Sequence, residues 1–77
     1  MFPLTITTVT KQLFSDDVTS VTLPGAEGEL TVLKNHVPLI TTLVKGTITV
    51  RGKGDNRTFP VTGGLLEVSR AGAVVLV

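Results

Sequence analysis

The residues best suited to chemistry in this 77-residue chain are its one histidine, His36, and two nearby acids, Glu27 and Glu29. A histidine beside carboxylates could bind a metal ion or transfer protons as a general acid or base. The chain has no cysteine and no second histidine, so a metal site would need carboxylates for its other ligands. Glycines flank both acids on what reads as an exposed turn, where solvation would make the two carboxylates chemically equivalent. The sequence therefore predicts no metal site and no acid–base pair here.

A nucleophile would need a serine held by His36 and a third group that orients the histidine. None of the three serines lies in a G-x-S-x-G elbow, the turn that exposes such a nucleophile. These serines are Ser15, Ser20 and Ser69. We therefore predict no catalytic residue.

Two glycine-rich segments resemble ligand-binding loops only superficially. The run "GKGDN" at 52–56 lacks the G-x-x-x-x-G-K-[ST] pattern of a phosphate loop, and no helical pattern follows it. We interpret it as the tip of a β-hairpin, and we interpret Gly63 and Gly64 as a tight turn or bulge before a strand. No cofactor is predicted.

The elements that must position all these residues are short β-strands. Thirteen Thr and twelve Val favour strands, and no apolar pattern of helical period escapes interruption by Gly or Pro. We predict an all-β domain spanning residues 1–77, with about ten short strands and no substantial helix. Its architecture should be a flattened barrel or a sandwich of two antiparallel sheets. The apolar runs that predict strands are Leu4–Ile6, Val18–Leu23, Leu30–Leu33, Leu39–Val44, Ile48–Val50, Phe59–Val61, Leu66–Val68 and Ala73–Val77.

The charge balance bears on the partners that the chain could bind. Seven basic and six acidic residues give no strong positive field, and three Phe without Tyr or Trp offer few surfaces for stacking bases. We expect no nucleic-acid partner and, without a signal-peptide or membrane-span pattern, a soluble chain. A small all-β module that binds protein or nucleic acid stays open as the alternative, because Arg51, Lys53 and Arg57 cluster on one predicted hairpin.

Two long segments carry a family resemblance. "VTSVTLPGAEGELTVLKNHVPLITTLVKGTITV" at 18–50 and "VTGGLLEVSRAGAVVLV" at 61–77 contain G-E-L, H-x-P-L and G-G-x-L-E-V in this order. The chain closely resembles the amino-terminal β domain of the epsilon subunit of the F-type rotary ATP synthase. It departs from the family pattern at Thr31, where a glycine is usual, and at Lys34 and Asn35, which replace a common proline and glycine.

The resemblance implies a non-catalytic subunit of the central stalk, or rotor, which docks on the gamma subunit and on the c-ring and couples proton flow to ATP synthesis. It implies that Glu29 makes the main ionic contact with the ring. The residues implied at the c-ring are Glu27, Gly28, Glu29 and Leu30, and those implied at gamma are Thr8, His36 and Thr41.

The resemblance also implies a location and a regulatory difference. The chain should lie at the cytoplasmic face of an energy-transducing membrane, either the bacterial cell membrane or an organellar one, and touch the membrane only through the complex. The helical hairpin that follows in many members is missing after Val77, in a naturally short member or a trimmed piece. We expect coupling without inhibition by that hairpin.

Overall fold

The computed structural model describes residues 1–35 and 37–77, and every regular element in these two ranges is a β-strand. The prediction of an all-β domain without a substantial helix is confirmed. No helix in the described ranges is long and apolar enough to cross a membrane. The strands are β1 (Phe2–Thr7), β2 (Gln12–Val18), β3 (Ser20–Gly25), β4 (Gly28–Leu33), β5 (Leu39–Leu43), β6 (Gly46–Arg51), β7 (Asn56–Val61), β8 (Gly64–Ser69) and β9 (Gly72–Leu76).

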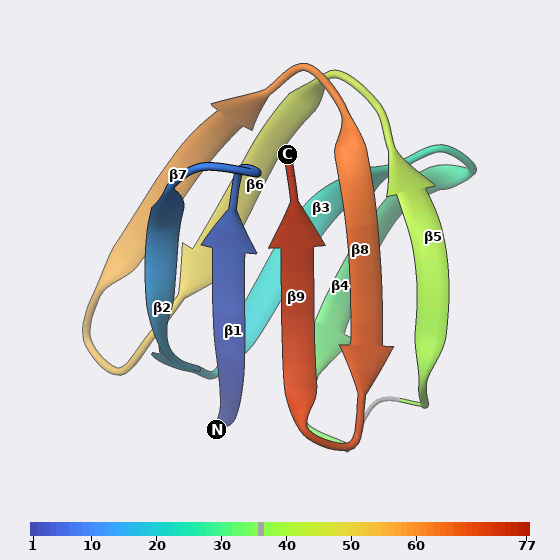
Figure 1. Cartoon of the computed structure of the whole chain (residues 1–77). Helices are drawn as coiled ribbons and strands as arrows, with labels where there is room; N and C mark the ends of the chain where they lie inside the picture. The colour runs from blue at the N-terminus through green and yellow to red at the C-terminus, as the bar shows by residue number, and fades with distance from the viewer. Residues whose placement is uncertain (36) are drawn as a thin grey trace.

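The strands form two layers that face each other (Figure 1). One layer runs β2-β1-β9-β8-β5, and the other runs β4-β3-β6-β7. A single residue pair, Gly25 with Leu43, joins β3 to β5 and connects the layers along one side. All pairings are antiparallel except that of β1 with β9, which is parallel. The chain is therefore a small sandwich that is closed along the β3–β5 side.

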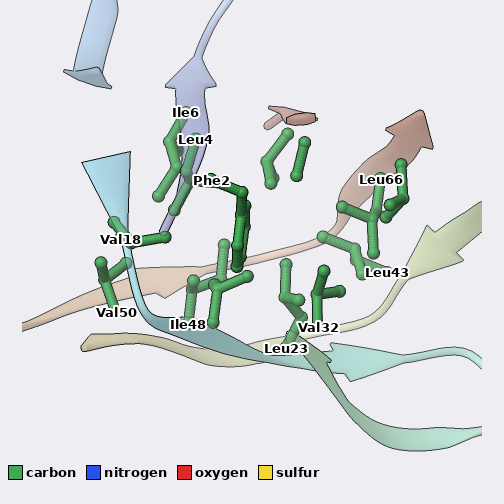
Figure 2. Packing of buried hydrophobic residues seen from close by; sticks show 14 residues of the cluster. Phe2, Leu4, Ile6, Val18, Leu23, Val32, Leu43, Ile48, Val50 and Leu66 are labelled. Carbon is green, nitrogen blue, oxygen red and sulfur yellow. The ribbon is translucent and has the colours of Figure 1, made fainter. Parts of the chain in front are cut away.

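The core lies between the layers, as Figure 2 shows for side chains from both of them. Leu4 and Ile6 of β1 are 1% and 0% exposed, whereas Thr5 between them is only half-buried. This alternation is what a strand with one buried face requires, because successive side chains point to opposite faces. Fully burying one such side chain contributes about 1.5–3 kcal/mol. The largest fully buried side chains are Leu4, Ile6, Val18, Val21, Leu23, Val32, Ile48, Val50, Leu66 and Val75.

The glycine-rich segments are connections between strands, as the sequence predicts. Residues 52–55 form the tip between β6 and β7, where the Gly52 amide donates to the Asp55 carbonyl at 2.7 Å. Gly54 has a φ of 77° there. Thr62 and Gly63 connect β7 to β8, and Gly64 is the first residue of β8. The φ values of Gly63 and Gly64 are 156° and 153°.

Candidate functional site

The hairpin between β3 and β4 carries Glu27 and Glu29, the two acids of the sequence-based candidate site. Its loop is two residues long, Ala26 and Glu27, between the paired residues Gly25 and Gly28. Gly28 has a φ of 125°, a region that glycine adopts readily and side-chain-bearing residues rarely do. The glycine that follows the loop therefore permits the tight turn that exposes Glu27.

Two backbone hydrogen bonds from β5 and its end hold this hairpin in place. The Ala26 amide donates to the Thr42 carbonyl at 3.0 Å, and the Val44 amide donates to the Pro24 carbonyl at 2.8 Å. The tip is thus fixed to the other layer on both sides of Gly25. A loop held this way presents its side chains in one orientation and loses little entropy when a partner binds.

The side chains of the hairpin divide between solvent and core. Glu27 and Glu29 are exposed, while Leu30 is half-buried and packs against the apolar core. Glu29 pairs with Pro24, one step along β4 from Leu30, so the two side chains point to opposite faces. The hairpin therefore offers two carboxylates to a cationic or hydrogen-bond-donating partner, and Leu30 supports them from beneath.

Thr8 lies in the turn between β1 and β2, where its hydroxyl organises the loop. Thr8 Oγ1 accepts from the Lys11 amide at 2.9 Å and from the Thr10 amide at 3.2 Å. The same hydroxyl lies 3.2 Å from the Lys11 carbonyl, to which it donates. A side chain with this many backbone partners primarily shapes the turn, which then presents Val9 to solvent at 88% exposure.

Thr41 lies on β5, opposite Leu66 of β8, and is half-buried. Its hydroxyl makes only a long 3.5 Å contact with the Thr42 carbonyl. Strands β9 and β8 separate β1 from β5, so the structure does not bring Thr8 and Thr41 together. His36, the third residue assigned to this surface, lies outside the described residues.

The two arginines of the β6–β7 hairpin do not share a face. Arg51 pairs with Asn56 and Arg57 with the buried Val50, so the two arginines point to opposite faces of their layer. Arg51 Nη1 donates to Thr22 Oγ1 at 3.3 Å. The Arg57 guanidinium lies over the rings of Phe14 and Phe59. Both arginines thus make contacts within the chain, which weakens the nucleic-acid alternative.

The other catalytic candidates are also separated in the structure. Ser20 is buried, whereas Ser15 and Ser69 are exposed. Ser69 Oγ accepts from the Ala71 amide at 3.2 Å and so shapes the turn between β8 and β9. Within residues 1–35 and 37–77, no group of three or more His, Asp or Glu side chains could hold a metal ion.

Sequence reasoning missed the residues that brace the hairpin. Thr42 and Val44 act through a backbone carbonyl and a backbone amide, and any residue except proline at position 44 could supply these groups. The only available signal was the length of the apolar run that predicts β5.

Comparison with known proteins assigns this architecture to a family. Residues 1–77 match the family model of the ATP synthase Delta/Epsilon chain, β-sandwich domain. The chain belongs to this family. Among curated relatives named ATP synthase epsilon chain, that of Caulobacter vibrioides is 41% identical over 66 residues, which is 86% of this chain and 77% of the relative. That of Pelotomaculum thermopropionicum is 46% identical over 65 residues, which is 84% of this chain and 48% of the relative.

Several relatives are much longer than the region that this chain matches. The relative from Desulforamulus reducens is 42% identical over 95% of this chain, but that region is only 55% of the relative. The chain thus spans about half the length of several epsilon relatives that it matches. The family assignment consequently concerns the β-sandwich.

Solved structures show the same fold. A chain in the mitochondrial ATP synthase of Euglena gracilis, solved as OSCP/F1/c-ring, superimposes with a TM-score of 0.90 and 24% identity over 97% of this chain and 49% of that chain. A chain of the Tetrahymena thermophila central stalk and c-ring gives a TM-score of 0.82 and 20% identity, over 97% of this chain and 61% of that chain. The β-sandwich fold therefore persists at low sequence identity.

Proposed function

We propose that this chain is the β-sandwich of an epsilon subunit in the central stalk of a proton-translocating F-type ATP synthase. It docks on the gamma subunit and on the c-ring, and it couples proton flow to ATP synthesis without catalysing a reaction or carrying a cofactor. The family match over residues 1–77 carries the proposal. The named solved neighbours, from a central stalk with its c-ring and from an F1 assembly with its c-ring, support the same context.

The c-ring contact in this proposal is made by the tip of the β3–β4 hairpin. Glu27, Gly28 and Glu29 are exposed there, and Glu29 makes the ionic contact while Leu30 supports the turn. The hydrogen bonds from β5 restrict the bending of the hairpin, and a turn held in this way transmits torque better than a free loop. The observation that favours this surface is thus the combination of exposed charge and a fixed backbone.

The gamma contact in this proposal includes Thr8 and Thr41, which lie on the five-stranded layer, and His36, which is outside the described residues. The single domain spans residues 1–77 and reaches the cytoplasmic face of an energy-transducing membrane only through the complex. Rigidity between two docking surfaces supports the coupling role, since a sandwich with two hydrogen-bonded layers resists twisting.

Co-purification with the rotor tests the proposal. The tagged chain should be captured together with the gamma subunit and the c-ring from membranes of its source cells, and its removal should uncouple ATP hydrolysis from proton pumping. A variant that reverses an exposed charge of the hairpin, Glu29→Lys, serves as the docking-deficient comparison. Capture of neither rotor component by the folded chain would reject the proposal.

A further inference from the structure

An open groove lies at the end of the sandwich opposite the β3–β4 hairpin tip. It has a volume of about 510 Å³ and is lined by the start of β1, the end of β4 and the turn between β8 and β9. In Figure 1 this is the lower end, where the chain begins and β8 turns into β9. We call it the end groove. Its volume falls in the range of about 300–1,000 Å³ that is typical of small-molecule sites.

The floor of the end groove is apolar and comes from both layers. Phe2 of β1 and Val68 of β8 belong to the five-stranded layer and are 9% and 5% exposed. Val32 of β4 belongs to the other layer and is 1% exposed. These side chains separate the groove from the core, and the apolar surface that a ligand could reach comes from Met1 and Leu33, which are 49% and 56% exposed.

Two uncharged polar side chains, Ser69 and Asn35, are among the described residues that line the end groove. Ser69 Oγ already accepts a hydrogen bond from the Ala71 amide. A sugar or nucleotide needs several polar partners to replace its bonds to water, because unpaired polar groups are costly to bury. A ligand with a hydrocarbon body needs fewer polar partners and fits this lining better.

Charge at the end groove has one sign. Lys34 and Arg70 line it, and the described lining contains no Asp or Glu, although the chain has six acids. Both cations lie in exposed positions, so a ligand could place an anionic head beside them and remain partly solvated. Leu33 lines the same groove and is 56% exposed, so an apolar tail would also cover surface that now meets water.

We propose that the end groove binds a single-chain anionic amphiphile, such as a medium-chain carboxylate. The tail lies along Met1 and Leu33 and over the edge of Phe2, and the head group lies beside Lys34 and Arg70. The groove is distinct from the proposed c-ring contact, because the groove and the hairpin tip are at opposite ends of β4.

Nuclear magnetic resonance titration of the purified chain with decanoate, below its micelle concentration and at neutral pH, tests the site. Saturable shifts should concentrate on Val32, Leu33 and Val68. Decyltrimethylammonium, which has the same tail and the opposite charge, should bind more weakly. Equal binding of the two amphiphiles, or decanoate shifts confined to the outer face of β5 and β8, would overturn the proposal, as would the absence of saturable binding.

Substitutions separate the tail from the head group. Lys34→Gln and Arg70→Gln should each weaken decanoate binding roughly two- to fivefold, the effect of losing one exposed ion pair. Lys45→Gln, between β5 and β6 at the end that carries the β3–β4 hairpin tip, is the matched control and should change nothing. Leu33→Asp should abolish the shifts, whereas Leu65→Asp on the outer face of β8 should not. Dispersed spectra establish that each variant is folded, and unchanged affinity in Leu33→Asp would refute the site.

Discussion

The rings of Phe14 on β2 and Phe59 on β7 meet edge to face, with 5.9 Å between their centroids and 70° between their planes. These strands are the two ends of the sheet path, on the side away from the β3–β5 junction. The Arg57 guanidinium carbon lies 5.4 Å from the Phe14 centroid and 5.2 Å from the Phe59 centroid. This three-residue cluster therefore joins the layers where no backbone pairing does.

Loss of the cluster should loosen that side of the sandwich. Phe14→Leu should lower the free energy of unfolding by about 0.5–1.5 kcal/mol through the lost ring pair. Arg57→Gln should lower it by about 0.5–1 kcal/mol, the range for an exposed cation over a ring. Because both side chains share one contact, the double variant should lose less than the sum, as measured by urea unfolding. Strict additivity would show that the contact carries no energy.

Glycine substitutions should separate backbone strain from steric clash. Gly28→Ala meets nothing within 4 Å, so only the φ of 125° opposes it, and the cost should be about 1–3 kcal/mol. Gly64→Ala should cost more, because its Cβ would also collide with the Leu76 carbonyl oxygen. Gly52→Ala is the control, since it has an ordinary φ and a nearest contact of 3.4 Å. Thermal unfolding followed by circular dichroism ranks the three, and Gly28→Ala matching the control would contradict the strain argument.

Glu29→Ala should weaken association with the c-ring and leave folding unchanged. An exposed ion pair contributes about 0.2–1 kcal/mol, so the loss should be modest and should shrink at high salt. Asp17→Ala, an exposed acid on edge strand β2, is the matched control. Binding assays at two salt concentrations measure both effects. A salt-independent loss would argue against an ionic contact, and loss of the β-sheet signal would indicate a structural role.

The sequence predicts the strands whose faces differ most in burial and misses the strand that has no such difference. The alternation of Leu4 and Ile6 with threonines predicts β1. Strand β2 has no such alternation, because it is exposed along most of its length and contains Asp16 and Asp17. An edge strand needs no apolar period, and charges there discourage pairing with other chains. The parallel pairing of β1 with β9 could not be predicted from local sequence patterns either, because it joins strands from the two ends of the chain.

The candidate site, too, is predictable from the sequence only in part. The glycines around Glu27 predict an exposed turn, because turn chemistry is local to a few residues. The hydrogen bonds that Thr42 and Val44 make to this turn depend on the tertiary packing of β5 beside β3. They involve only backbone atoms, so the side-chain sequence does not reveal them. The separation of Thr8 from Thr41 likewise follows from strand order, which local patterns do not encode.

ATP should not bind tightly to the isolated chain. The GKGDN segment is a hairpin tip between two strands, so it lacks the helix N-terminus that phosphate loops use to hold anions. Isothermal titration with Mg-ATP should therefore give no micromolar affinity. A saturating heat in that range would contradict this expectation, and chemical shifts would then identify the residues involved.

The outer face of the five-stranded layer should cause self-association at high concentration. Leu65 pairs with Leu76, and Glu67 lies between Ile40 and Val74, so four exposed apolar side chains surround one carboxylate. Apolar surface removed from water contributes about 25 cal/mol per Å², while burial of an unpaired charge opposes contact. Glu67→Leu should therefore strengthen association and Leu65→Lys should weaken it, with Leu13→Lys on β2 as the control for an added charge. Sedimentation across a concentration series measures all three, and a monomeric Glu67→Leu variant at every concentration would show that this face does not drive association.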